Sequence, residues 1–147
     1  MDIATWLPIL LSGISMAVSV ITYCQNIRHD RKRDTLTAFN NLQHEVLDKI
    51  NGYTKKQITE ISQNPRSPEY KELSSLLARL EHFSVGVNTR VYDRKIVIRM
   101  AGIYFVSVYD KLSPLIEKKR TLIKTEKHYD EFERLAGQVR KIYPTKE

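Results

Sequence analysis

The sequence has few of the residues from which catalytic and metal sites are usually built. Its single cysteine cannot form an internal disulfide, which fits a reducing compartment. The five glycines stand singly, so the sequence has no glycine-rich phosphate loop, and it has neither a CxxC pair nor an HExxH motif. These absences predict a protein that is not an enzyme and that binds neither a cofactor nor a metal.

Charge is missing from the N-terminal part of the chain. The segment from Ile3 to Cys24 has no charged residue and is longer than the about 20 residues that cross a hydrocarbon core of ~30 Å. A cleavable signal peptide is the alternative, but no Lys or Arg precedes the segment. Tyr23-Cys24-Gln25-Asn26 follows it where a small-x-small cleavage site would be expected. We therefore expect residues 1–27 to form a transmembrane anchor that is retained.

The polar and helix-bending residues of this segment fall on one stripe of a helix. Their spacings alternate between 3 and 4, which is the a/d pattern of a left-handed coiled coil. The members of the stripe, called the seam below, are Thr5, Pro8, Ser12, Ser15, Ser19, Thr22 and Asn26. Small side chains and hydroxyl groups hold helices together in lipid. The seam therefore predicts a homo-oligomer or a contact with another membrane protein.

A basic collar, residues 28–34, follows the anchor. Its cationic residues, set against two aspartates, are Arg28, Arg31, Lys32 and Arg33. The positive-inside rule predicts that the N-terminus lies outside and that residues 28–147 lie in the cytoplasm, where residues 35–147 form the helical domain. The collar is interpreted as a contact with anionic membrane lipids, to which each cation contributes about 1 kcal/mol. This interpretation is favoured over a nucleic-acid site, although the net charge of the chain is +7.

The cytoplasmic part begins with signals for three helices. The first continues the membrane helix without a break as far as the stop signal Asn51-Gly52. A capping box at Thr54 opens a short helix to about Ser62, and Ser67-Pro68 starts the next one. The expected buried face of this third helix repeats every three or four residues through Tyr70, Leu73, Leu77, Leu80, Phe83 and Val87.

The second half of the domain contains the most apolar stretch outside the anchor, Ile96 to Tyr109. Its β-branched residues allow a strand, but its length favours a central buried helix, capped by Asp93 and kinked or restarted by Pro114. A last helix is expected from about Thr125 to Tyr143. The predicted fold is all-α, with a single N-terminal transmembrane helix followed by a small cytoplasmic helical bundle.

Polar residues near the expected core are the remaining candidates for a site. They are Glu81, His82, Asp93 and Arg99. Neighbouring residues on a helix point about 100° apart, so Glu81 and His82 do not act on one atom together. Arg99 interrupts the apolar stretch and must either face water or pair with a carboxylate such as Glu81 or Asp110. We interpret these residues as structural or as contacts with an unidentified cytoplasmic protein.

Three runs of the sequence resemble a known group of proteins. These runs are residues 76–87, Val91-Tyr92-Asp93 and residues 109–120. They are similar to short bacterial proteins of unknown function with one N-terminal membrane helix and a small helical cytoplasmic domain. The resemblance implies a bacterial origin, the same topology and no established catalytic residues. Such proteins are often carried by phages or genomic islands, which implies a setting in phage conflict.

Three hypotheses follow for the function. The first is a membrane-tethered interaction or scaffold protein that acts by binding at the cytoplasmic face of the bacterial inner membrane. The alternative is an oligomeric effector that permeabilises the membrane through its Ser/Thr-lined helices, since hydroxyl groups can line a water-filled path. The third is a membrane-bound hydrolase or nuclease that uses the four polar candidates. Contacts between small residues in membranes are usually dry, so the first hypothesis is favoured.

Overall fold

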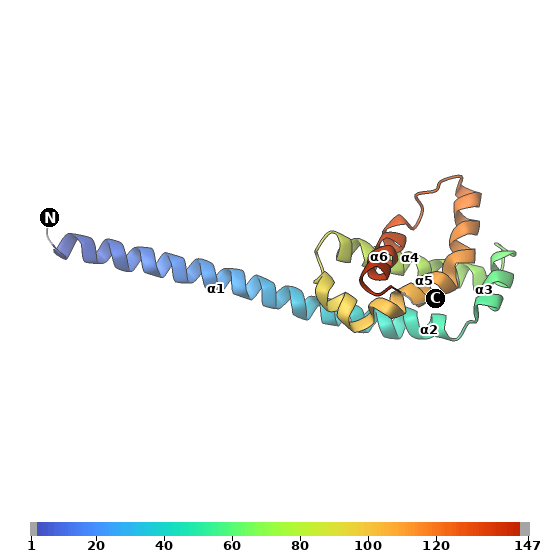
Figure 1. Cartoon of the computed structure of the whole chain (residues 1–147), viewed down its shortest axis with the longest axis horizontal. Helices are drawn as coiled ribbons and strands as arrows, with labels where there is room; N and C mark the ends of the chain where they lie inside the picture. Colours follow the sequence, from blue (N-terminus) through green and yellow to red (C-terminus); the bar gives the residue numbers. More distant parts are fainter. Residues whose placement is uncertain (1–2, 145–147) are drawn as a thin grey trace.

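The computed structural model describes residues 3–144, and of residues 3–5 it describes the backbone only. All regular elements in this range are helical, which confirms the all-α prediction (Figure 1). In chain order the elements are α1 (Ile3–Leu42), the π-helical turn η1 (Gln43–Leu47), α2 (Asp48–Asn51), α3 (Lys55–Ser62), α4 (Pro68–Asn88), α5 (Arg94–Ile123) and α6 (Asp130–Ile142).

The first helix projects from the bundle as a rod and also enters its core (Figure 1). Side chains 6–34 are all exposed, and this part, called the rod below, is long and apolar enough to cross a membrane. From Thr35 onward the same helix becomes buried, and η1 and α2 carry it on to Ile50. No Gly or Pro lies between Gly13 and Gly52. The predicted unbroken continuation of the N-terminal apolar helix into the bundle is therefore confirmed.

The predicted helix starts in the middle of the chain are also confirmed. Thr54 and Gln57 form a reciprocal capping box, in which the Gln57 N–H donates to Thr54 Oγ1 at 3.2 Å. Ser67 Oγ accepts the N–H of Tyr70 at 3.1 Å, and Pro68 occupies the first turn of α4. All six residues predicted for the buried face of this helix are buried.

The apolar stretch from Ile96 to Tyr109 lies within helix α5, so the strand alternative is wrong. Pro114 does not restart this helix, although it lacks the N–H that would bond to the Asp110 carbonyl. Ser113 Oγ donates to that carbonyl instead, at 2.9 Å. The backbone leaves helical geometry at Ala101, with φ −146° and ψ 16°. In Figure 1 the orange end of α5 points away from its yellow beginning.

The last helix begins later than the sequence predicts. Lys124 ends α5 in the left-handed conformation, with φ 57°, and Tyr129 has φ 64° just before α6 starts at Asp130. Residues 125–129 therefore form a turn and not the first turn of a helix. The periodicity that starts at Tyr129 predicted the buried face of α6 correctly, but the predicted boundary at Thr125 is wrong.

Four phenylalanines from four helices lie at the centre of the bundle. Phe83 of α4 stacks on Phe105 of α5, with ring centroids 5.8 Å apart. Phe39 of α1 lies 6.4 Å from both of these rings, and Phe132 of α6 meets Phe105 edge-on. Aromatic pairs at such distances contribute about 0.5–1.5 kcal/mol beyond the area they bury. The helix that forms the rod is therefore part of the central packing.

Candidate functional sites

The predicted seam lies along the rod. Thr5 falls outside the residues whose side chains are described, and the others (Pro8, Ser12, Ser15, Ser19, Thr22 and Asn26) are all exposed. The helix is continuous through Pro8, so these residues share one face as their spacing predicts. Within residues 3–144 no other segment covers this face. The partner that the seam implies must come from lipid or from another helix.

Two hydroxyl groups of the seam are already bonded within the helix. Ser19 Oγ donates to the Ser15 carbonyl and Thr22 Oγ1 donates to the Val18 carbonyl, each at 2.8 Å. Such bonds satisfy the hydroxyl proton, which would otherwise be costly to place in lipid. Each oxygen can still accept a bond from a neighbouring helix. The seam is therefore compatible with a dry contact between helices.

The cationic side chains predicted for the basic collar are exposed to solvent. Arg28, Arg31, Lys32 and Arg33 are all exposed, as the interpretation of a lipid contact requires. The first three are spaced i, i+3 and i+4 and line one side of a hollow of 640 Å³, called the collar hollow below. Its other side is formed by the turn between α4 and α5 and by the end of α6. The residues there are Arg90, Tyr92, Asp93, Arg94, Lys95, Ile98 and Ile142.

Asp93 has a structural role at the junction of the rod and the bundle. Its Oδ1 accepts the N–H groups of Lys95 and Ile96 at 3.0 and 3.3 Å, so it caps α5 as predicted. Its own N–H donates to Oγ1 of the fully buried Thr35, at 2.7 Å. Thr35 also donates to the Arg31 carbonyl at 2.6 Å. One hydroxyl group thus joins the collar to the α4–α5 turn.

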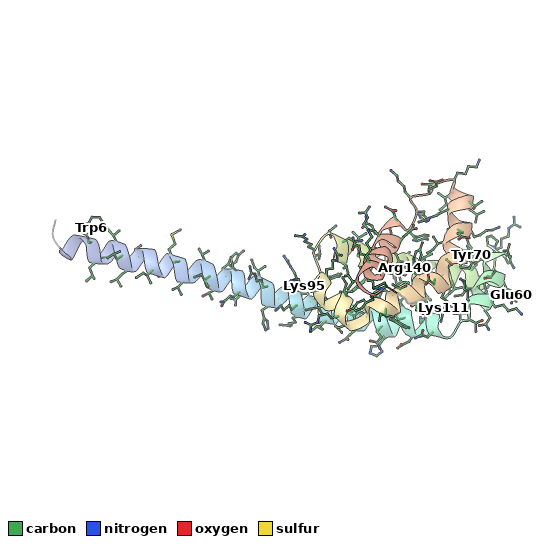
Figure 2. All side chains as sticks on the ribbon, viewed as in Figure 1. Trp6, Glu60, Tyr70, Lys95, Lys111 and Arg140 are labelled. Atoms are coloured by element: carbon green, nitrogen blue, oxygen red, sulfur yellow. The ribbon has the colours of Figure 1, made fainter. Side chains whose placement is uncertain are left out.

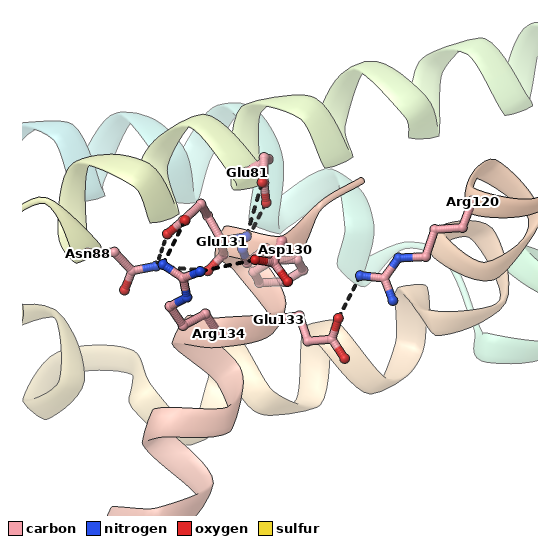
Figure 3. Close-up of polar contacts among 8 residues, drawn as sticks. Glu81, Asn88, Arg120, Asp130, Glu131, Glu133 and Arg134 are labelled. Carbon is pink, nitrogen blue, oxygen red and sulfur yellow. Dashed lines mark hydrogen bonds and ion pairs between the residues drawn. The ribbon is translucent and has the colours of Figure 1, made fainter. Parts of the chain in front are cut away.

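Glu81 is likewise structural, and it caps a helix distant in sequence. Its two carboxylate oxygens accept the N–H groups of Glu131 and Phe132, at 3.1 and 2.8 Å (Figure 3). Tyr129, at the N-cap of α6, provides no side-chain bond of its own. A carboxylate at the positive end of a helix is stabilising. Asn88 supports this contact from α4, since its Nδ2 donates to Glu131 Oε2 at 2.7 Å.

His82 and Arg99 remain available to a partner. His82 is exposed and lines a hollow of 490 Å³ beside the ion pair of Arg79 with Glu45. Arg99 is exposed too, so of its two predicted alternatives it faces water. Asp110, one of the carboxylates expected for it, pairs with Arg140 instead. The four polar candidates therefore do not converge on one site.

Arg99 borders a largely apolar hollow of 450 Å³ on α5, called the α5 hollow below. Met100, Ile103 and Tyr143 line it, with 46, 67 and 41% of their surfaces exposed. The hollow lies where the helix departs from regular geometry at Ala101. Exposed apolar side chains gathered beside a charged rim are typical of a protein-contact surface.

Arg120, near the end of α5, has a structural role. Arg120 donates to Glu133 Oε2 of α6 at 2.6 Å (Figure 3). It also donates to the His128 carbonyl at 2.9 Å, so it joins the end of α5 to the start of α6. The hydrogen bond from Arg120 lowers the pKa of the Glu133 carboxyl group. Among the described residues no cluster of three or more His, Cys, Asp or Glu side chains has metal-binding geometry.

Sequence reasoning missed Thr35 and the cations of the α4–α5 turn. Arg94 and Lys95 were visible only as the charged flank of an apolar stretch, and Arg90 as part of a connection. More than fifty residues separate them from the collar, and no spacing rule joins residues at that distance. Arg90 adopts φ 65°, a conformation in which glycine is usual, but an arginine in the sequence gives no sign of it.

Comparison with protein families identifies one match. The family described as "Domain of unknown function (DUF4760)" matches residues 9–139, from the rod to the last helix. The match covers most of the chain, so the chain belongs to this family. No curated protein and no solved structure matches the chain.

Proposed function

For this member of the DUF4760 family, we propose a role as a membrane-tethered interaction protein. The rod spans the bacterial inner membrane with its N-terminus outside, and the bundle lies at the cytoplasmic face. The seam joins the rod to another membrane helix, either in a second copy of the chain or in another protein. The bundle then holds a cytoplasmic partner at a defined place on the membrane.

The observation that carries this proposal is the unbroken helix between the rod and the core. Phe39 belongs to the same helix as Ser15 of the seam, and its ring packs against Phe83 and Phe105. A flexible linker would let the bundle rotate freely below its anchor. Here a rotation of the rod turns the core with it, so contacts made along the seam set which face of the bundle points outward.

The α5 hollow is the surface on which the partner is expected. Met100 and Ile103 supply its apolar centre, and Arg99 supplies a charge at its rim. The combination of an apolar centre with a charged rim suits a protein contact better than a small substrate, since no nucleophile and base converge there. A partner held there could belong to a response to phage, the setting that the sequence resemblance implies.

Permeabilisation of the membrane is the weaker alternative. A water-filled path needs hydroxyl groups that are free to bond to water along its wall. Ser19 and Thr22 instead donate their protons to backbone carbonyls of their own helix. Their oxygens can still accept bonds from water, so the preference for a dry seam rests on the fact that contacts between small residues in membranes are usually dry. Unchanged membrane potential during strong expression of the full chain is the expected result.

The proposal is tested by separating the tether from the bundle. A photo-activated crosslinker at Ile103 is placed in three chains in living cells: the full chain, a chain that starts at residue 34, and a chain whose residues 3–24 are replaced by polyleucine. The cut before residue 34 keeps Thr35 and the buried part of α1. We expect one discrete protein adduct from both anchored chains and its loss from the soluble one. The same adduct at full yield from the soluble chain would refute the need for a tether.

A matched variant tests the partner surface. Met100→Lys places a charge at the centre of the α5 hollow and is expected to abolish the adduct, because a charge there must lose water when the partner docks. Leu122→Lys changes a side chain that is equally open, at 53% exposure, but lies outside the hollow. It is expected to leave the adduct unchanged. Equal loss from both variants would argue against the α5 hollow.

A further inference from the structure

The collar hollow combines charges from two distant parts of the chain. Arg28, Arg31 and Lys32 face it from the rod, and Arg90, Arg94 and Lys95 face it from the α4–α5 turn. Figure 2 shows Lys95 beside the rod at the base of the bundle. Within residues 3–144 none of these six side chains forms an ion pair with a carboxylate. The hollow is therefore strongly cationic, with Asp93 as its one acidic lining residue.

The two sides of the hollow are held in a fixed relation. Thr35 Oγ1 bonds to the Arg31 carbonyl on one side and to the Asp93 N–H on the other. The Asp93 carboxylate is occupied in turn by the first N–H groups of α5. Tyr92, in the same turn, is held by its ring, which stacks on the ring of Phe83 with the two centroids 5.2 Å apart. The cations are therefore presented from rigid elements and not from a loose surface.

Two local arrangements at this turn are unfavourable for the fold alone. Arg90 has φ 65°, a conformation that glycine adopts at less cost. Arg94 and Lys95 place two positive charges in the first turn of α5, where the helix dipole favours negative charge and where the N-cap carboxylate of Asp93 is the one acidic group. An anion bound in the hollow relieves this repulsion. Features that weaken the fold locally are expected where a site has a binding role.

The position of the hollow along the rod identifies the anion. The uncharged part of the chain ends at Ile27, and the next four residues rise about 6 Å along the helix. The polar layer of a bilayer adds roughly 5–8 Å on each side of the hydrocarbon core. Arg28, Arg31 and Lys32 thus lie at the depth of the phosphate groups when the rod spans the membrane.

From these observations we infer that the collar hollow binds the phosphate of an anionic membrane lipid between the rod and the α4–α5 turn. Guanidinium groups suit this task because they form paired hydrogen bonds with phosphate oxygens. The inference rests on the proposed membrane span, and it adds a specific lipid site to the general attraction of the collar. A bound lipid would fix the height and tilt of the bundle above the membrane.

The test measures lipid binding to the full chain purified in detergent, by native mass spectrometry. Phosphatidylglycerol and phosphatidylcholine with identical acyl chains are titrated separately. We expect phosphatidylglycerol to bind at least tenfold more tightly, because its phosphate carries a net charge while choline compensates the other. Equal affinity for the two lipids would overturn the inference. Inorganic phosphate in excess is expected not to displace phosphatidylglycerol, and displacement would assign the hollow to a soluble phosphate compound.

Variants on the bundle side of the hollow distinguish a specific lipid site from a general attraction between the cationic collar and anionic lipid. Arg94→Gln combined with Lys95→Gln is expected to weaken binding of phosphatidylglycerol by roughly tenfold. Arg33→Gln is the matched control, because it removes a cation from the collar at a residue that does not line the hollow. It is expected to change the affinity less than twofold. Equal effects of the control and the double variant would mean that lipid binds by non-specific charge attraction, which would refute the inference.

A further variant distinguishes loss of lipid binding from loss of folding. Arg90→Gly removes a cation that lines the hollow, and glycine adopts the left-handed conformation of this position at less cost than arginine. It is expected to weaken lipid binding while leaving the melting temperature of the bundle unchanged or higher. Unchanged lipid affinity would contradict the inference. This assay does not depend on the crosslinked partner, so loss of lipid binding with the partner adduct intact would refute the lipid site alone.

Discussion

The two halves of the first helix differ in which side chains are exposed, although the backbone joins them without a break. In the rod, apolar side chains such as Leu10 and Ile14 are exposed to 58 and 61%. Beyond Asp34 the same helix buries Phe39 and Leu42 to 5 and 7% exposure. A helix that is apolar on nearly all sides requires an apolar environment all round, such as lipid, whereas one with an apolar stripe requires a protein core on one side. The collar marks the point where one requirement replaces the other.

The largest expected difference between the halves is in the free energy of unfolding. Phe105→Ala removes the ring that touches Phe39, Phe83 and Phe132, and should lower the stability of the bundle by about 3–5 kcal/mol. Ile14→Ala in the rod should leave bundle stability unchanged, because Ile14 is exposed and touches none of the core. Urea unfolding of the full chain in mild detergent, followed by circular dichroism, measures both. A comparable loss from Ile14→Ala would show that the halves are not energetically separate.

The junction between the halves is expected to give the next largest effect. Thr35→Val leaves the Asp93 N–H without its buried acceptor, which should cost about 2 kcal/mol. Thr37→Val is the matched control, since the exposed hydroxyl group of Thr37 bonds only to the Arg33 carbonyl of its own helix, at 3.1 Å. It should change stability by less than about 0.5 kcal/mol. Equal losses of stability from the two variants in urea unfolding would show that the Thr35 hydroxyl group does not link the collar to the α4–α5 turn.

A pair of glycines distinguishes close packing from open helix surface within the bundle. A Cβ atom on Gly86 would lie 2.5 Å from the ring of Tyr92, so Gly86→Ala should destabilise the bundle by about 1–3 kcal/mol. A Cβ on Gly137 would meet nothing within 4 Å, so Gly137→Ala should stabilise α6 by about 0.5–1 kcal/mol. Thermal melts should move in opposite directions. A gain from Gly86→Ala would mean that Tyr92 is not held against α4.

The smallest expected effect concerns acid stability of the contact between α5 and α6. The hydrogen bond from Arg120 lowers the pKa of Glu133 in the folded protein. The stabilisation is therefore complete above the unfolded pKa of about 4.3 and is lost as the pH falls through the lower folded value. Arg120→Met should flatten this part of the stability profile, measured by urea unfolding between about pH 3 and pH 6. An unchanged slope would show that the pair contributes nothing in solution.

The sequence was sufficient for the helices but not for the contacts between them. Caps at Thr54, Ser67 and Asp93 are local patterns, and their predictions were confirmed because each requires residues only two or three positions apart. Pro114 was expected to kink or restart the helix, and it does not restart it, because α5 continues through Pro114 and Ser113 Oγ takes up the carbonyl that proline cannot bond. The carboxylate of Glu81 was noticed, but its partners lie fifty residues away at the start of α6. Such pairs follow from tertiary packing, which periodicity alone does not fix.

Photo-crosslinking in living membranes shows whether the seam of the rod contacts another protein helix. The crosslinker is placed at Ser15 in one chain and at Ala17, about 200° around the helix and at nearly the same depth, in the control. The account predicts a discrete protein adduct from Ser15, either a multiple of the chain's own mass or a complex with one other protein, and mainly lipid from Ala17. Capture of lipid alone at both positions would contradict it.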